Sequence, residues 1–431
     1  MKDKRRAMKV LWLCNIMLPA IARSLGFPAS NKEGWLSGLA AMIGSEGDKE
    51  MELGICFPVD GEPIRGRAGA LAYYGFPEDM VHPENYDAAL ETALEKIIED
   101  FEPDIVHCFG TEYPHTLAMT RAFDRPQRTL IGIQGLCFVY ADAYMADLPQ
   151  RICRRTLLRD FLRKDNLLQQ QEKYRRRGEY EKEAISRAAH VTGRTDWDKK
   201  WTAAVNADAS YHFMNETLRP QFYGAQWDRR HCRRFSIFLS QGNYPIKGLH
   251  YMLEALPKVL ERYPGAHVYV AGDEITRFNT VREKIKISNY GKYLRELIGK
   301  YHLQQAVTFL GRLDADQMLE QYLRSHVFVS PSAIENSPNS VGEAMLLGMP
   351  VVSSDVGGVH NMLTAGKEGF LYEPADTDAL AQHICFMFDE REETAVLEMA
   401  RAARAHALRT HDPQSNYRRL MEIYHEIYLC V

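Results

Sequence analysis

The sequence of 431 residues lacks several features that define other classes of protein. Its eight cysteines form no C-x-x-C pair, and several lie in apolar runs, so we expect buried, reduced thiols in a cytosolic protein. It contains no run of eighteen apolar residues, so we expect no membrane-spanning helix. With a net charge of −4, it offers no overall positive charge to nucleic acid, and we expect no nucleic-acid partner.

What is present fits a soluble α/β protein of two or three domains. The most informative stretch is residues 327–363, which reads as strand, loop, helix, strand, loop and helix. Its first apolar run is typical of a buried parallel strand. Because Pro338 cannot lie inside a helix, the helix must begin at Asn339 or Ser340, and Gly348 is its stop signal.

Two carboxylates lie on this stretch, Glu335 in the loop and Glu343 in the first turn of the expected helix. A helix N-terminus presents unpaired N–H groups and a partial positive charge, which suit a phosphate or pyrophosphate. Carboxylates beside such a site need other partners. Sugar and ribose hydroxyls fit, because an ionised carboxylate accepts several hydrogen bonds. The pattern therefore indicates recognition of a nucleotide-linked sugar.

Each carboxylate also has a simpler interpretation. Ser340-Val341-Gly342-Glu343 matches the S-x-x-E capping box, in which Glu343 only closes the start of the helix. A loop glutamate such as Glu335 is usually just solvated. Spacing alone leaves both interpretations open.

A second glycine-bounded loop, residues 242–248, follows the strand expected at residues 235–240. Lys247 in this loop suits a pyrophosphate, because its ammonium group would neutralise charge on a leaving group. The loop does not satisfy the Walker A pattern. Two further expected strands, residues 267–272 and 307–312, end at Gly272 and Arg312.

The order Glu335-x7-Glu343, Gly348-Met349-Pro350-Val351-Val352 and Gly357-Gly358-Val359 resembles the nucleotide-sugar signature of family 4 glycosyltransferases, of the group 1 type. Those are retaining enzymes of the GT-B fold, with two Rossmann-like doubly wound α/β domains facing a cleft. The resemblance implies that Glu335 contacts the transferred sugar and Glu343 the ribose. The predicted donor-binding residues are Gly34, Gly242, Asn243, Lys247, Gly272, Arg312, Asn336, Ser337, Asn339, Ser340 and Glu343.

The sequence departs from the family at Asn243, where an arginine is common. Neutralisation of the diphosphate by two cations would then need another arginine, such as Arg194. The resemblance also implies that the nucleotide base lies against the loop after residues 307–312.

The start of the chain permits two interpretations. A basic leader followed by apolar residues 10–22 could pass for a signal peptide, whereas residues 8–13 fit the first strand of a Rossmann-like domain. Asn15 and Pro19 interrupt the apolar run, and Gly34 begins a glycine-containing segment before a helix. A doubly wound domain places a phosphate-facing loop there, which favours the strand.

A further buried strand is expected at residues 103–107, ended by Gly110. Ligands of open α/β sheets bind at the carboxyl ends of such strands. Similar glycosyltransferases have a histidine near the sugar in this stretch, for which we select His107, with His115 as the alternative. His107 also fits a packed strand histidine.

We expect an acceptor-binding domain at residues 1–225, a donor-binding domain at 226–410 and a closing helix at 411–431 that returns to the first domain. Residues 151–177 carry ten basic and three acidic residues with an apolar stripe. Such a segment can contact anionic lipid, so peripheral association with the inner membrane surface is one hypothesis. The alternative is that its arginines pair with Glu179, Glu181 and Glu183 and simply cover the domain.

The D-x-D pattern of metal-dependent glycosyltransferases occurs at residues 196–198, 314–316 and 376–378, and each has a turn or cap explanation. Because GT-B enzymes use helix dipoles and basic side chains on the diphosphate, we expect no metal and no cofactor. The predicted function is retaining transfer of a hexose-type sugar from a nucleotide diphosphate sugar to a carbohydrate or lipid-linked acceptor, with Glu335, His107 and Lys247 as catalytic residues. A GT-B nucleotide-sugar epimerase and a non-catalytic carbohydrate-binding protein are the alternatives.

Overall fold

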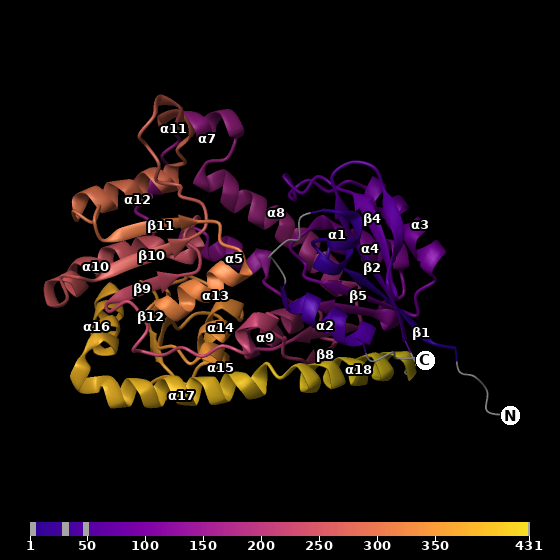
Figure 1. Cartoon of the computed structure of the whole chain (residues 1–431). Coiled ribbons are helices and arrows are strands. Elements are labelled where there is room, and N and C mark those ends of the chain that lie inside the picture. The colour runs from indigo at the N-terminus through magenta and orange to yellow at the C-terminus, as the bar shows by residue number, and fades with distance from the viewer. Residues whose placement is uncertain (1–5, 28–33, 46–50, 430–431) are drawn as a thin grey trace. The chain divides into compact units, whose positions relative to one another are not determined.

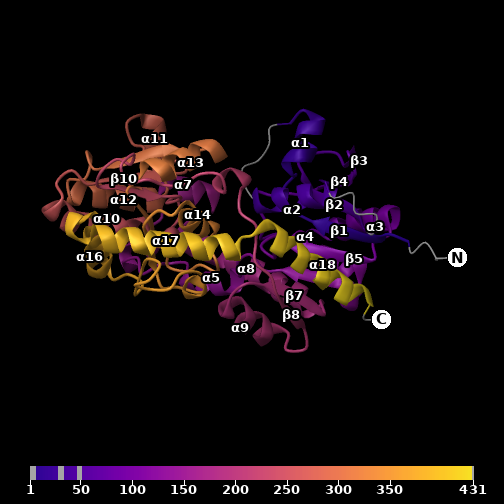
Figure 2. The ribbon, with the colours of Figure 1, turned by 60° about the horizontal axis from the view of Figure 1, so that its bottom comes forward.

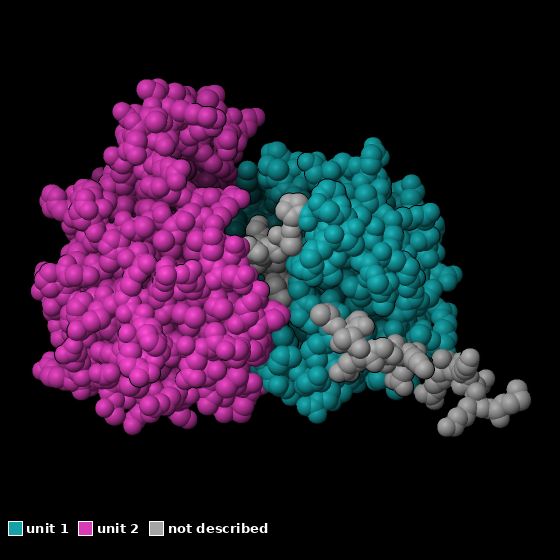
Figure 3. All heavy atoms as spheres, in the orientation of Figure 1, with its two compact units in different colours: residues 1–139, 173–219, 411–431 teal, residues 140–172, 220–410 magenta. Residues whose placement is uncertain are grey.

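The computed structural model describes residues 6–27, 34–45 and 51–429. The chain divides into two compact units, coloured separately in Figure 3. Unit 1 comprises residues 1–139, 173–219 and 411–431, and unit 2 comprises residues 140–172 and 220–410. Helices α5 (Cys137–Ala143) and α8 (Leu167–Ser186) contribute residues to both units.

Unit 1 is built on an eight-stranded sheet with the order β3-β4-β2-β1-β5-β6-β7-β8 (Figure 1). All neighbouring strands are parallel except β3, which is antiparallel to β4. The strands are β1 (Met8–Leu13), β2 (Met51–Val59), β3 (Ile64–Ala68), β4 (Leu71–Pro77), β5 (Ile105–Phe109), β6 (Thr129–Gly132), β7 (His190–Gly193) and β8 (Ser210–Phe213).

Helices cover both faces of this sheet. Successive side chains of β1 point to opposite faces of the sheet, and those on both faces are apolar. Val10 and Trp12 belong to one hydrophobic core, and Leu11 and Leu13 belong to the other. The α-helices of the unit other than α5 and α8 are α1 (Pro19–Leu25), α2 (Gly34–Ser45), α3 (Ala89–Phe101), α4 (Pro114–Phe123), α9 (Asp196–Val205) and α18 (Pro413–Leu429), and residues Pro126–Arg128 form a 3-10 turn, η1.

Unit 2 contains a six-stranded, fully parallel sheet with the order β11-β10-β9-β12-β13-β14. Its strands are β9 (Ser236–Leu239), β10 (His267–Ala271), β11 (Val307–Gly311), β12 (Val327–Ser330), β13 (Val351–Ser354) and β14 (Phe370–Tyr372).

Unit 2 also contains the helices that connect and flank these strands, together with three 3-10 turns (Figures 1 and 2). They are α6 (Gln150–Cys153), α7 (Leu158–Arg163), η2 (Pro220–Phe222), η3 (Pro245–Lys247), α10 (Leu249–Arg262), α11 (Val281–Lys286), α12 (Asn289–Lys300), α13 (Ala315–Arg324), α14 (Asn339–Leu347), α15 (Val359–Met362), α16 (Thr377–Phe388), η4 (Glu390–Glu392) and α17 (Glu393–Thr410).

Residues 8–13 form β1 in the interior of the unit 1 sheet, so the strand interpretation of the N-terminal stretch is confirmed. The closing helix α18 belongs to the same unit and packs against β5 and α2. Its Tyr424 hydroxyl accepts a hydrogen bond from the indole N–H of Trp12 (2.7 Å). None of the helices that the structure describes is long and apolar enough to cross a membrane.

The unit boundaries differ from the expected ones at two places, the smaller of which is residues 220–225, expected in the first domain and found in unit 2. Residues 140–172, which the sequence placed in the first domain, belong by their contacts to unit 2. Asn289, at the start of α12, accounts for part of this: its side-chain amide donates to the carbonyl oxygens of Ile152 (2.6 Å) and Arg155 (2.8 Å). No pattern in the local sequence predicts contacts between residues that are so far apart in the chain.

Candidate functional site

Three loops meet at the carboxyl edge of the unit 2 sheet, after β9, β12 and β13. Gly248 and Gly357, at φ values of 66° and 57°, allow the first and third loops to approach the middle one. A Cβ on Gly248 would overlap the carbonyl oxygen of Pro331, and a Cβ on Gly357 would overlap that of Glu335. The loop that carries Glu335 is therefore held between its two neighbours.

Lys247 and Glu335 meet across these loops. The Lys247 ammonium nitrogen lies 2.5 Å from Oε1 of Glu335, which also accepts a hydrogen bond from the Ser332 hydroxyl (2.8 Å). The Glu335 residue is only 7% exposed, whereas the Lys247 side chain is 20% exposed. The expectation of a merely solvated Glu335 is thus wrong, because packing of the three loops buries the carboxylate beside a cation.

Helix α14 begins directly after this loop, and its N-cap is Pro338, which has no side-chain group to cap the helix. Ser340 lies inside the first turn, so the capping box of Ser340 and Glu343 does not form. Glu343 lies a turn further along and is 4% exposed. The capping interpretation is wrong because the proline starts the helix two residues before Ser340.

The segment just before α14 contains buried polar groups. Among the described residues, the Ser337 hydroxyl in this segment has no hydrogen-bond partner, and neither does the side-chain oxygen of Asn243 in the loop after β9. The Asn336 N–H donates to the hydroxyl of Tyr140 (3.1 Å). An uncapped helix start beside such groups offers donors to an anionic ligand.

The sequence did not point to Ser332 or Tyr140. Ser332 could have been found, because it lies between the end of β12 and Glu335 in the same motif. Tyr140 could not, because 196 residues separate it from its partner Asn336.

The remaining predicted donor residues lie at different places. Gly272 (φ 98°) follows β10, while the exposed Arg312 pairs with Asp273 through two contacts of 2.7 and 2.8 Å. Gly34 is the first residue of α2 in unit 1, and the loop before it, residues 28–33, lies outside the described residues. Arg194 is also in unit 1, where it forms an ion pair with Glu216 (2.5 Å).

His107 is fully buried on β5, and its Nδ1 lies 2.8 Å from the Tyr424 hydroxyl. Burial lowers the pKa of His107 to about 3, so the imidazole is neutral. The cavity beside it measures about 10 Å³, which is room for one water and not for a sugar. This environment favours the packed strand histidine, and a role at the sugar stays a prediction.

His115 is equally buried at the start of α4. Its two ring nitrogens lie 2.6 Å from a Glu78 oxygen and 2.9 Å from the Asn15 side-chain oxygen. Both ring positions are thus occupied by partners within unit 1.

Two acids near the carboxyl end of β5, the buried Glu181 and the half-buried Glu112, were not selected as a pair from the sequence. Glu181 on α8 accepts hydrogen bonds from the Thr111 hydroxyl (2.5 Å) and the Phe138 N–H (3.1 Å), and burial raises the pKa of the Glu181 carboxyl to about 8. Burial also raises the pKa of Glu112. Glu181 is one of four glutamates on α8, and nothing in the local sequence distinguishes the buried one from the others.

The three D-x-D patterns belong to helix starts. Asp314 and Asp376 are the N-caps of α13 and α16, and Thr195 with Asp198 forms the capping box of α9. Within the described ranges, no group of three or more His, Cys, Asp or Glu side chains is arranged to hold a metal ion.

Comparison with known proteins assigns this arrangement to a class. The solved structure of sucrose-phosphate synthase from Thermosynechococcus elongatus aligns over 98% of this chain and all of its own, with a TM-score of 0.68 and 14% identity. That of the Anabaena protein HepE in complex with UDP-glucose aligns over 97% of this chain and all of its own, with a TM-score of 0.67 and 16% identity. The chain therefore has the two-domain α/β fold of GT-B glycosyltransferases.

The family follows from the sequence of unit 2. The profile of the family described as "Glycosyl transferases group 1" matches residues 225–405, and these residues are a domain of that family. An uncharacterized glycosyltransferase of Methanocaldococcus jannaschii is 31% identical over 145 residues, which cover 34% of this chain and 33% of that protein. The alignments to the first curated relatives span only 27% to 41% of those proteins' own length.

Proposed function

We propose that the protein is a retaining glycosyltransferase that moves a hexose-type sugar from a nucleotide diphosphate sugar to an acceptor hydroxyl, in polysaccharide or glycolipid synthesis. The observation that carries the proposal is the contact between Lys247 and Glu335 beside the uncapped start of α14. A cation, a helix N-terminus and a buried carboxylate at one edge match the charges of such a donor.

The diphosphate would lie at the start of α14. Backbone N–H groups and the helix dipole stabilise negative charge there, and Lys247 adds a full positive charge. These groups favour departure of the nucleoside diphosphate, because charge grows on it as the glycosidic bond breaks. Ser337 and Asn243 would supply further hydrogen bonds.

The two carboxylates would bind hydroxyl groups. We assign Glu335 to the transferred sugar and Glu343 to the ribose. Both side chains are buried, and a carboxylate can accept several hydrogen bonds from hydroxyl groups. Glu335 would also offset the positive charge that develops at the anomeric carbon. Its contact with Lys247 makes it a weak nucleophile, so we propose front-face displacement within an ion pair in place of a covalent sugar intermediate.

Donor binding gives the first test. We expect UDP-glucose or another nucleotide diphosphate sugar to raise the melting temperature by several degrees, because a ligand at 100 times its Kd stabilises the native state by about 2.7 kcal/mol. The measurement is a thermal-shift panel of nucleotide sugars, with the matching nucleoside monophosphates and free sugars as controls. No shift with any nucleotide sugar would contradict the proposal. A donor consumed without acceptor would indicate the epimerase instead.

The variant Glu343→Gln refines this test. It should leave the melting temperature of the free protein nearly unchanged and reduce the shift caused by the donor, since the neutral amide is a weaker acceptor for ribose. Glu368→Gln is the matched control: Glu368 is 6% exposed and accepts from the Thr364 N–H, after α15 and before β14. A loss of about 1 kcal/mol of stability with donor affinity intact would show that Glu343 supports the fold and does not bind the donor.

Metal independence is a second prediction. We expect transfer to continue in EDTA, because Lys247 and the start of α14 would neutralise the diphosphate. The measurement is the initial transfer rate with excess EDTA and after return of Mn²⁺ or Mg²⁺. Loss of activity that only a divalent cation restores would overturn the metal-free assignment.

A further inference from the structure

Two short helices of unit 2, α7 and α11, expose large apolar side chains. The exposed fractions are 71% for Phe161, 68% for Leu162 and 73% for Val281. The two helices pack against each other and form a protrusion of unit 2 (Figures 1 and 3). The other exposed large apolar side chains of the described residues are scattered singly or in other elements. We define the α7–α11 surface by Leu158, Phe161, Leu162, Val281 and Ile285.

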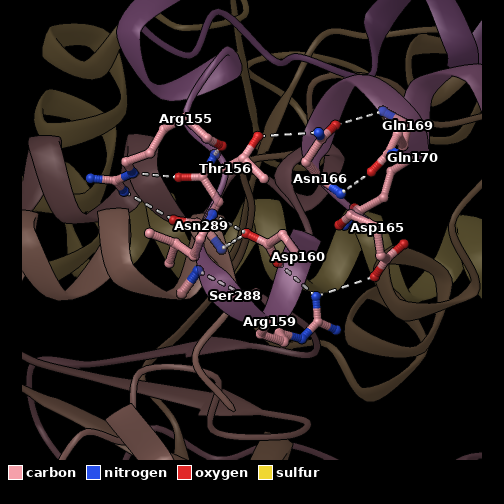
Figure 4. A network of polar contacts seen from close by, with 12 residues as sticks. Arg155, Thr156, Arg159, Asp160, Asp165, Asn166, Gln169, Gln170, Ser288 and Asn289 are labelled. Atoms are coloured by element: carbon pink, nitrogen blue, oxygen red, sulfur yellow. Dashed lines mark hydrogen bonds and ion pairs between the residues drawn. The ribbon is translucent and has the colours of Figure 1, made fainter. Parts of the chain in front are cut away.

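A network of polar contacts, drawn in Figure 4, joins α7 and the residues before it to the start of α12. The Asp160 carboxylate on α7 is only 1% exposed; it accepts from the Asn289 N–H (3.1 Å) and pairs with Arg159 (2.9 Å). Arg155 donates to the side-chain oxygen of Asn289 (2.6 Å) and pairs with Glu296 of α12 (2.5 Å). The outward direction of Phe161 and Leu162 is therefore held by packing on the opposite side of α7.

Basic side chains lie next to the apolar ones along both helices. Arg163 and Lys164 end α7, and Arg282, Lys284 and Lys286 lie on α11, all exposed. The acidic residues nearby have other partners: Glu283 accepts from the Thr280 N–H, and Asp165 pairs with Arg159. An apolar patch rimmed by cations matches the chemistry of an anionic bilayer surface.

We propose that the α7–α11 surface docks unit 2 reversibly onto anionic lipid bilayers. Phe161, Leu162 and Val281 would enter the boundary between headgroups and acyl chains, while the surrounding cations contact lipid phosphates. Charge selects this occupant, because a second copy of a chain with net charge −4 offers less negative charge per area than such a membrane.

The surface differs from the segment that the sequence suggested. Residues 151–177 do not form one amphipathic helix, because α7 ends at Arg163 and α8 begins at Leu167. At least four of the ten basic residues have partners inside the protein, among them Arg155, Arg159, Lys173 and Arg177. The apolar partner α11, more than a hundred residues away, was not foreseen.

The experiment is co-sedimentation of the full chain with vesicles of phosphatidylcholine alone or mixed with phosphatidylglycerol, at low and high salt. We expect binding to the mixed vesicles that weakens with salt, and little binding to neutral ones. Phe161→Ser/Leu162→Ser should lower binding about tenfold or more, because it removes the apolar contribution. Arg163→Glu/Lys164→Glu should lower it by about fivefold or more per residue.

Matched controls separate the surface from general effects. Phe213→Ser changes an apolar residue of unit 1 that is 53% exposed, and Lys96→Glu/Lys367→Glu changes two exposed lysines elsewhere. Both should bind vesicles as the parent does. Far-UV circular dichroism and the donor-induced thermal shift should be unchanged in every variant, which keeps this inference distinguishable from the proposed reaction.

Three outcomes would overturn the proposal. They are equal, negligible binding to both vesicle types, equal loss of binding in the control variants, and concentration-dependent self-association that Phe161→Ser/Leu162→Ser abolishes without any vesicle binding. The last would assign the surface to contacts between copies of the chain.

Discussion

Replacement of Glu335 by alanine is expected to lower the turnover number by about 10²- to 10³-fold while the protein stays folded. The carboxylate is the buried acceptor that contacts Lys247 and Ser332, and we assign it to the transferred sugar. Its removal leaves Lys247 without this partner. The cost to folding is small because the lysine side chain is 20% exposed and can reach water.

The measurement is initial rate at saturating donor, together with the melting temperature. Glu335→Gln separates charge from shape, since it keeps the volume and loses the negative charge. Glu368→Ala is the control for removal of an equally buried carboxylate, and it should cost stability through Thr364 and His406 with turnover intact. Unchanged transfer by Glu335→Ala would refute the assigned role.

Gly357→Ala is expected to abolish most of the activity, although it changes no side chain that is proposed to contact the donor. The new methyl group would overlap the Glu335 carbonyl oxygen, and the backbone at φ 57° disfavours any side chain. The Gly358 N–H also donates to that carbonyl (3.2 Å), so the two loops must move together. We expect at least a 10²-fold loss of turnover, because displacement by about 1 Å has this effect on positioned groups.

Gly366→Ala is the matched control for this variant. Gly366 has a similar φ of 73°, but a Cβ there would meet no atom within 4 Å. Gly366→Ala should therefore reveal the effect of backbone strain alone. We expect it to lower the free energy of unfolding by about 1 kcal/mol or somewhat more and to leave the turnover number unchanged. Equal kinetic effects of the two substitutions would show that the clash with Glu335 has no special role. Rates and denaturant midpoints of both variants decide this.

Several elements were predictable because their signals are local. Pro338 and Gly348 bound α14 at residues 339–347, close to the helix expected from the proline and the glycine alone. The strands expected at residues 267–272 and 307–312 appear at 267–271 and 307–311. The closing helix expected at residues 411–431 appears as α18, which buries Tyr417, Leu420 and Tyr424.

Other conclusions required the folded chain. The S-x-x-E pattern at residues 340–343 is compatible with a capping box, and only the actual helix start at Pro338 excludes it. From the sequence alone, His107 fits a site residue or a core residue equally well. Its contact with Tyr424, 317 residues away, decides that its Nδ1 faces the core.

By itself, the sequence determined the alternation of strands and helices, the glycine turns and the position of both glutamates beside a helix start. These depend on backbone preferences of neighbouring residues, which act over a few positions. Only the tertiary structure decided that Lys247 meets Glu335 across 88 residues, and that α7 and α11 form one exposed surface. Such pairs are set by how the loops and helices pack in space, because their free energy comes from contacts that do not exist until the chain has folded.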